Sequence, residues 1–182
     1  MKLKTILVCL VLTFCLYSCN ENKTSKDTNE TEKIEDDKEL FKVTLSAIVT
    51  KDDSFQLYYM DDDSQPFDEN KSFFIDIKGS PVSQDIVFKL PKDELPNFLR
   101  IDFGVNKEQS DIVITNFKIN YFDKIFEAKG SSFFNYFVVN EQTITKDVAN
   151  SSLKPKILEN GNYDPITYSE LGLYEEIQKI IK

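Results

Sequence analysis

The stretch "FKVTLSAIV", residues 41–49, alternates strictly between apolar and polar side chains over most of its length. Its apolar positions are Phe41, Val43, Leu45, Ala47 and Val49. Successive side chains of a strand point to opposite faces, so a period of two indicates a strand with one buried face. The folded part of the chain is therefore expected to open with a half-buried β-strand.

The same alternation recurs along the chain after residue 50. It predicts strands at 55–60, "SFFIDIK" (72–78), "DIVFKL" (85–90), "FLRIDF" (98–103), "TNFKINYF" (115–122), "SSFFNYFVV" (131–139) and "QTITKDV" (142–148). Turn signals such as "KGSP" and "NKEQSD" separate these strands at short intervals, as an antiparallel sandwich requires. We predict an all-β fold, a jelly-roll-like antiparallel β-sandwich over residues 40–168.

The last residues follow a different period. "TYSELGLYEEIQKIIK", residues 167–182, places Leu173, Ile177 and Ile180 at helical spacing, with Ser169 as the expected N-cap. This pattern predicts a short helix over residues 169–182 that packs on the sandwich.

The amino terminus has the features of a secretion signal. Residues 1–18 combine the basic residues Lys2 and Lys4 with an apolar run that is too short to span a bilayer. The quartet "LYSC" at its end resembles the lipobox of bacterial lipoproteins, which implies that Cys19 is lipidated and becomes the first mature residue. Several acyl chains anchor a protein stably, whereas one alone holds it only marginally.

Residues 19–39 are almost entirely polar, and we expect a disordered tether between the lipid and the domain. The three cysteines, Cys9, Cys15 and Cys19, all lie at or before the start of this tether, so the domain has no disulfide. Removing Lys2 and Lys4 with the signal changes the formal net charge from −9 to −11. Such a charge repels polyanions and excludes a nucleic-acid partner.

Residue types that commonly carry catalysis are missing. The chain contains no histidine, and no serine stands in a GxSxG or SxxK motif. We therefore expect a protein that is not an enzyme. A glycoside hydrolase that uses two carboxylates remains an alternative, because sequence cannot tell how far apart two acids lie.

The acidic segment after Met60 raises the question of a metal site. An EF-hand that began at Asp61 would lack both the glycine and the last ligand of that motif. A looser structural calcium site could use Asp61 and Asp63 together with Asp68 or Glu69. The competing interpretation is a solvated turn, which aspartate and Pro66 both favour. We expect no cofactor other than this calcium ion.

Four residues are candidates for ligand binding. Arg100 is a single arginine among many lysines, and alternation places it on the same face as Asp102. Its planar guanidinium suits a carboxylate or a pair of sugar hydroxyls. The competing interpretation is an ion pair, either Arg100–Asp102 or a cross-strand one. Tyr58 and Tyr59 point to opposite faces, so just one of them can stack on a ligand.

Four segments follow one another along the chain: "FQLYYMDDDSQPFDENKS" (55–72), "FKLP" (88–91), "LRIDFG" (99–104) and "GNYDPIT" (161–167). Together they resemble an accessory β-sandwich, similar to carbohydrate-binding modules, of bacterial membrane and cell-surface proteins that handle polysaccharide. The resemblance implies a non-catalytic module that binds glycan. An adaptor that binds another envelope protein is the alternative. Together with the lipobox, the resemblance implies a lipoprotein of the Gram-negative cell envelope, at the outer membrane or cell surface. The expected partners are the membrane and either a glycan or an envelope protein.

Overall fold

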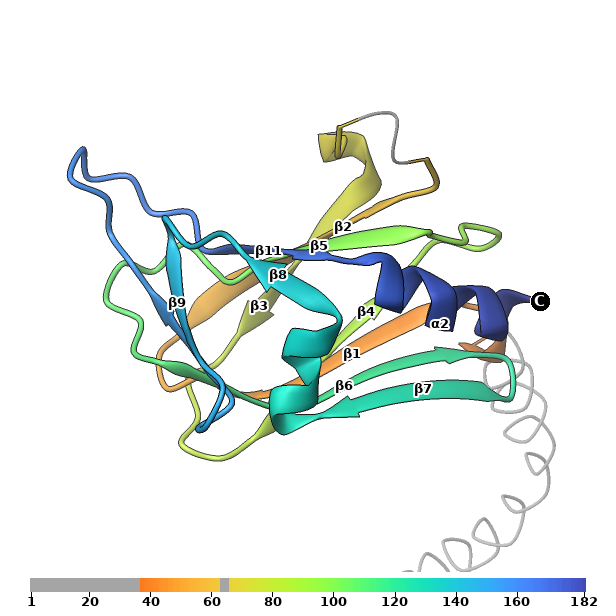
Figure 1. Ribbon diagram of the computed structural model, residues 1–182, viewed down its shortest axis with the longest axis horizontal. Coiled ribbons are helices and arrows are strands. Elements are labelled where there is room, and N and C mark those ends of the chain that lie inside the picture. The colour runs from red at the N-terminus through yellow and green to blue at the C-terminus, as the bar shows by residue number, and fades with distance from the viewer. Residues whose placement is uncertain (1–36, 63–65) are drawn as a thin grey trace, which may run out of the picture. The chain divides into compact units, whose positions relative to one another are not determined.

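The computed structural model describes residues 37–62 and 66–182, which form two antiparallel β-sheets and a C-terminal helix (Figure 1). The expected signal peptide, Cys19, Asp63 and most of the expected tether lie outside the described residues. Within the described ranges, no helix has the length and apolarity needed to span a bilayer.

One sheet has six strands in the order β4-β1-β6-β10-β9, with β7 paired to β6 beside β10. Its strands are β1 (Lys42–Ile48), β4 (Gln84–Lys89), β6 (Ile112–Tyr121), β7 (Lys124–Lys129), β9 (Ile144–Asp147) and β10 (Ser152–Pro155). We refer to it as the six-stranded sheet.

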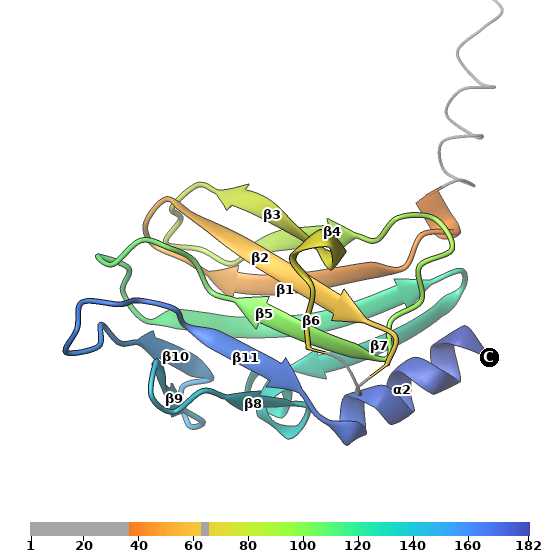
Figure 2. The same cartoon turned by 90° about the horizontal axis from the view of Figure 1, so that it is seen from above.

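The other sheet has five strands in the order β3-β2-β5-β11-β8 (Figure 2). Its strands are β2 (Asp53–Met60), β3 (Ser72–Ile77), β5 (Phe98–Asp102), β8 (Phe137–Val139) and β11 (Ile166–Ser169). The chain changes sheet after β1, β3, β4, β5, β7, β8 and β10. The predicted all-β antiparallel sandwich with a short C-terminal helix is confirmed.

The apolar side chains of both sheets meet in one core. Phe41, Val43, Leu45, Ala47 and Val49 are all buried, as the opening alternation predicts. The inward positions of β4, β5 and β6 are buried in the same way. Burial of large apolar side chains is the main contribution that stabilises such a sandwich.

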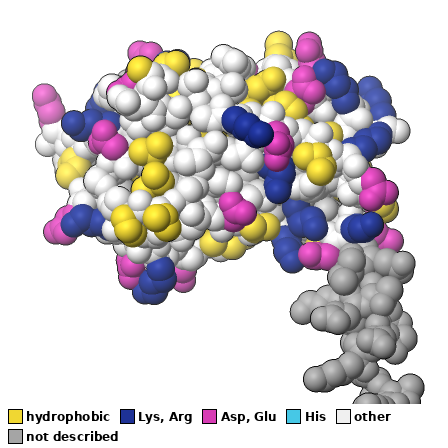
Figure 3. All heavy atoms as spheres, turned by 90° about the horizontal axis from the view of Figure 1, so that it is seen from below, with side chains coloured by type: hydrophobic (Ala, Val, Ile, Leu, Met, Phe, Trp, Pro, Cys, Tyr) yellow, Lys and Arg dark blue, Asp and Glu magenta, His cyan; other side chains and the backbone are white. Residues whose placement is uncertain are grey.

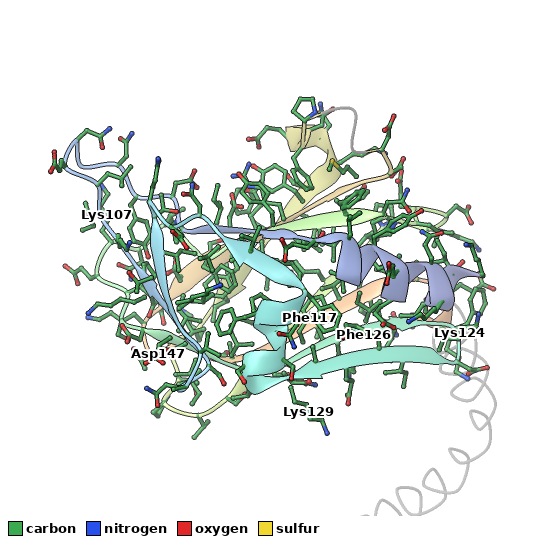
Figure 4. All side chains as sticks on the ribbon, in the orientation of Figure 1. Lys107, Phe117, Lys124, Phe126, Lys129 and Asp147 are labelled. Carbon is green, nitrogen blue, oxygen red and sulfur yellow. The ribbon has the colours of Figure 1, made fainter. Side chains whose placement is uncertain are left out.

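Aromatic rings fill the part of the core under the helix. The Phe117 ring packs edge-on against Phe126, Phe133 and Phe137, with centroids 6.5, 5.9 and 5.0 Å away. Figure 4 labels Phe117 on β6 and Phe126 on β7, the two strands of the six-stranded sheet that helix α2 (Leu171–Ile181) contacts. Edge-to-face contacts of this kind add to the free energy gained from burial alone.

The strand predicted at 131–139 is wrong over its first half. Residues Gly130–Asn135 form a 3₁₀ helix, and only Phe137–Val139 form a strand. Four residues along an extended strand span about 13 Å, which is too far for ring contact. The turn instead brings Phe133 and Phe137 together as a stacked pair with centroids 4.5 Å apart, and this packing overrides the alternating pattern.

The helix begins later than predicted, and Ser169 is not its N-cap. Glu170 occupies the N-cap position, while Ser169 ends β11 and pairs with Phe137. The Ser169 hydroxyl accepts a hydrogen bond of 2.8 Å from the Leu99 backbone N–H, so it is engaged in the sheet. Leu173 and the other predicted apolar helix positions are buried.

Candidate binding face

The outward face of the five-stranded sheet is built around Arg100. Strand β5 lies between β2 and β11, and Arg100 stands directly opposite Tyr58 on one neighbour and Tyr168 on the other (Figure 2). Directly opposed residues of antiparallel strands project to the same side of a sheet. The three side chains therefore form one row across the middle of this face.

Arg100 and Asp102 form an ion pair on this face. Arg100 Nε donates to Asp102 Oδ1 and Arg100 Nη2 donates to Asp102 Oδ2, each over 2.7 Å. The two side chains are only 20% and 13% exposed. Within the described ranges, Nη1 donates no hydrogen bond. The Arg100–Asp102 ion pair, one of the two interpretations of the sequence, is therefore present. The Nη1 nitrogen remains able to donate to a ligand.

Aromatic rings enclose the guanidinium. The Arg100 Cζ atom lies 4.5 Å from the centroid of the Tyr58 ring and 5.9 Å from that of Tyr168. The Phe67 ring, from the loop after β2, lies 6.3 Å from the Tyr58 ring and 6.1 Å from the Tyr168 ring. Cation–π contacts strengthen as water is removed, so these rings favour a fixed position of Arg100.

Burial on this face shifts the pKa values of the Asp102 carboxyl and the Tyr58 hydroxyl. Burial raises the pKa of the Asp102 carboxyl to about 6, although the Arg100 ion pair acts in the opposite direction. Burial, together with a 2.9 Å hydrogen bond to Glu69, raises the pKa of the Tyr58 hydroxyl to about 12. Tyr58 therefore keeps its proton at neutral pH and donates it to Glu69.

Tyr59 has a different position from Tyr58. Its side chain points inward, is 4% exposed and packs in the hydrophobic core. Tyr58 lies on the outward face but is also 4% exposed, because its neighbours cover it. Together they form the Arg100 cluster, which consists of Arg100, Asp102, Tyr58, Tyr168, Phe67 and Glu69. Of the two tyrosines, only Tyr58 belongs to the face that carries Arg100.

The acidic loop is organised by hydrogen bonds to its own neighbours. Asp61 forms a 2.8 Å ion pair with Lys71, and Asp68 accepts from the Asn70 backbone N–H at the start of the 3₁₀ helix Glu69–Lys71. No group of three acidic side chains among the described residues could hold a metal ion. Because Asp63 lies outside the described residues, the calcium site stays a prediction.

A pocket of about 610 Å³ opens beside the Arg100 cluster. Its lining residues are Tyr59, Met60, Asp61, Asp62, Pro66, Phe67, Asp68, Glu69 and Lys71. Phe67 and Glu69 belong to both the pocket and the Arg100 cluster. The cluster is therefore bordered by a hollow whose wall combines an aromatic ring with carboxylates and a lysine.

Two apolar side chains stand exposed at the edges of the same sheet. Phe74 on β3 is 57% exposed, and Val138 on β8 is 41% exposed. Phe74 lies directly opposite Gln56 of β2, and Val138 lies opposite Tyr168 of β11. The outward face thus has a charged centre with aromatic cover and apolar margins.

The outward face of the six-stranded sheet has a different composition. It carries mainly polar and charged side chains, which Figure 3 shows as a surface of blue, magenta and white with scattered yellow. Ser46 of β1 lies opposite Asp85 of β4 there, and Lys118 of β6 lies opposite Thr44 of β1. These side chains are of the kind that remains hydrated on a sheet surface.

The end of β5 is fixed by a carboxylate. Asp53 Oδ1 accepts from the backbone N–H groups of Val105 and Asn106, and Oδ2 accepts from the Gln109 side chain. A Cβ atom on Gly104 would lie 2.3 Å from the Asp53 carboxylate, and Gly104 has φ +95°. Glycine is therefore required here, directly after the strand that carries Arg100 and Asp102.

Sequence reasoning missed Phe67 and Tyr168 as members of the cluster. Tyr168 lies on β11, whose four residues were too few to show an alternating pattern. The segments at 55–72, 99–104 and 161–167 nevertheless supply β2 with its loop, β5, and the start of β11, which are adjacent in the sheet. The sequence signal that could have pointed to Phe67 and Tyr168 was therefore that they lie in or next to these segments.

Comparison of the chain with protein-family models, with curated proteins and with solved structures found no match. Its function must therefore be argued from the site. The outward face of the five-stranded sheet can donate hydrogen bonds from Arg100, accept them at the Asp102 and Glu69 carboxylates, and stack flat groups on aromatic rings.

Proposed function

We propose that this protein is a lipid-anchored, non-catalytic binding protein of the cell envelope, and that it binds glycan on the outward face of the five-stranded sheet. The observation that carries the proposal is the Arg100–Asp102 ion pair, held among aromatic rings on an exposed sheet face. Sugars present hydroxyl pairs and apolar ring faces, which this combination of groups can contact together.

The ion pair is held in a fixed geometry before any ligand arrives. Two parallel hydrogen bonds hold Asp102, and the Tyr58 ring holds the guanidinium from the side. A bidentate arginine–carboxylate pair has a defined orientation, so a ligand that meets it loses little side-chain entropy in the protein. The fixed geometry supports binding of hydroxyl groups that accept a hydrogen bond from Arg100 Nη1 and donate one to the Asp102 carboxylate.

The exposed ring of Phe74 supports contact with an apolar sugar face. It is separated from Arg100 by strand β2, so a ligand that spans both would lie across β3, β2 and β5. The lipobox-like quartet that ends at Cys19 supports anchorage to a membrane.

An adaptor that binds another envelope protein is the second candidate. The exposed side chains of Phe74 and Val138 lie on the two edge strands of the five-stranded sheet, β3 and β8. Edge strands and exposed apolar margins are features that protein partners recognise. A glycan face depends on the central Arg100, whereas a protein interface would depend mainly on the apolar margins.

A glycan array tests the proposal directly. The mature chain from Cys19 to Lys182 is applied with and without Ca²⁺, beside Arg100→Lys and Phe74→Ala. The matched control is Phe122→Ala, because Phe122 is 53% exposed and lies away from this face in the turn between β6 and β7.

The proposal predicts binding that both face variants weaken and that the control leaves unchanged. Binding to no glycan, or binding that the face variants leave intact, would contradict it. Release of shorter sugars from a bound glycan would instead favour the hydrolase alternative.

A further inference from the structure

The turn between β6 and β7 holds an exposed aromatic residue in an unfavourable backbone conformation. Tyr121 pairs with Lys124, so Phe122 and Asp123 form a two-residue hairpin loop. Phe122 has φ +49° and is 53% exposed. Glycine, asparagine and aspartate favour such positions, and a bulky side chain there is a backbone outlier. The fold alone gives no reason for a phenylalanine at this position.

The polypeptide enters the domain at the same turn. The Phe122 backbone N–H donates to the Lys38 carbonyl over 2.9 Å, and Lys38 Nζ lies 3.5 Å from Asp123 Oδ1. The segment that leads from Cys19 therefore joins the domain beside Phe122. Figure 4 labels Lys124 at this end and Lys107 at the opposite end of the domain.

The neighbours of Phe122 suit the boundary between water and lipid. Ile125 is 61% exposed, and the Tyr121 ring lies 4.7 Å from the Phe122 ring. The Lys124 ammonium donates to the Lys179 carbonyl at the end of helix α2 over 3.2 Å. Aromatic rings and lysines together are typical of interfacial regions, where the ring is buried and the ammonium reaches water.

The one acidic side chain in the loop does not oppose such a contact. Asp123 is exposed, but Lys38 lies next to it, so the charge at the tip is compensated. Single exposed apolar residues are common on proteins and need no explanation by themselves. Here the exposed ring coincides with an unfavourable φ and with the point where the chain enters.

We propose that the β6–β7 hairpin tip, residues 121–125, contacts the lipid surface in which the Cys19 anchor is inserted. The inference rests on the anchorage part of the proposed function. A polar tether of about 20 residues spans roughly 25 Å as a coil. Linkers of this kind give effective concentrations in the millimolar range. A contact by two side chains, too weak to bind from solution, is therefore populated beside the membrane.

Fluorescence tests this contact with little background, because the chain contains no tryptophan. Phe122→Trp and Ile125→Trp place single reporters at the hairpin tip. Val105→Trp places one at the far end, where Val105 is 68% exposed. Each lipidated mature chain is reconstituted in phosphatidylethanolamine–phosphatidylglycerol vesicles, with and without bromine on the acyl chains, and circular dichroism checks that each variant is folded.

The proposal predicts a blue-shifted emission for both tip reporters and severalfold stronger quenching by brominated lipid than for Val105→Trp. Equal quenching at all three positions would overturn it. Flotation of the wild-type chain and of Cys19→Ala reports anchorage separately. Flotation without quenching at the tip rejects the hairpin contact and leaves the anchor intact, whereas no flotation of the wild type rejects the anchor and the contact with it.

Discussion

The two outward faces of the sandwich arise from the same alternation, yet they are built differently. The six-stranded sheet presents exposed charged residues such as Asp85, Glu127 and Lys129. The five-stranded sheet presents Arg100 and Asp102, which are largely removed from water. Taking an ion pair out of water is unfavourable and seldom repaid in stability. The second face therefore carries a feature that stability does not require and that the proposed binding role would use.

Breaking the Arg100–Asp102 ion pair should change the free energy of unfolding more than any other substitution on the two outward faces. Arg100→Ala leaves the Asp102 carboxylate buried without its partner, and we expect a loss of about 3 kcal/mol or more in the free energy of unfolding. Lys118→Ala on the other outward face should change it by less than about 0.5 kcal/mol. Urea denaturation at neutral pH measures both.

The double variant Arg100→Met with Asp102→Leu sharpens the same comparison. Because it removes both charges together, it should be more stable than Arg100→Ala alone. A double variant as unstable as the single one would show that the buried charge is not the cause.

The next largest effect on stability is expected at Gly104, where the Asp53 carboxylate holds the end of strand β5. Gly104→Ala forces a side chain onto the Asp53 carboxylate at φ +95°, and we expect a loss of at least about 2 kcal/mol in unfolding free energy. Gly161→Ala is the matched control, since Gly161 has φ +80° and no atom within 4 Å of its Cβ position. Its loss should be about 1 kcal/mol, from the backbone alone. Equal losses would mean that Asp53 adjusts freely.

The pH dependence of stability tests the buried carboxylate. The pKa of Asp102 is raised to about 6 in the folded protein, so the folded state holds the proton more tightly than the unfolded state. Its contribution to stability is complete below about pH 4 and is lost as the pH rises through about 6, on the order of 2 kcal/mol.

The corresponding measurement compares unfolding free energies from pH 4 to pH 7 in the wild type and in Asp102→Asn. The substitution should remove this part of the pH dependence, while Asp85→Asn on the other outward face should leave it in place. Identical pH profiles for the wild type and Asp102→Asn would show that burial does not govern this carboxyl.

Relief of the strained turn should have a smaller effect of opposite sign. Phe122→Asn places a residue that tolerates positive φ at the hairpin tip, and we expect the unfolding free energy to rise by about 1 kcal/mol. Thermal unfolding of the mature chain without lipid measures the change. If the variant is more stable and also loses its contact with lipid, the phenylalanine serves the membrane contact rather than the fold. An unchanged or lower unfolding free energy would contradict the strain at this turn.

Much of the fold could be predicted because strands with five or more alternating residues specify their own faces. The stretch around Val43 and the motif that ends in Gly104 are examples, and both have the predicted buried side. Strands β10 and β11 have four residues each, and buried and exposed positions do not alternate along either of them. Phe133 was misassigned because its contact with Phe137 depends on the tertiary fold.

The binding face could be predicted only in part for the same reason. Alternation along β5 identified Arg100 and Asp102, whereas alternation along β2 left Tyr58 and Tyr59 as alternatives. Tyr168 could not be placed without knowing that β11 pairs with β5. Phe67 reaches the cluster from a loop, and no periodic pattern governs where a loop side chain lies.

Calorimetry measures the proposed binding of glycan to the outward face of the five-stranded sheet. The best ligand from the array is titrated into the mature chain, into Phe74→Ala, and into Val87→Ala on the opposite outward face. We predict that Phe74→Ala weakens the affinity roughly two- to tenfold, as loss of about 0.5 to 1.5 kcal/mol of ring contact implies, and that Val87→Ala leaves it unchanged. Equal affinities for both variants, or a loss confined to Val87→Ala, would contradict the assignment of this face.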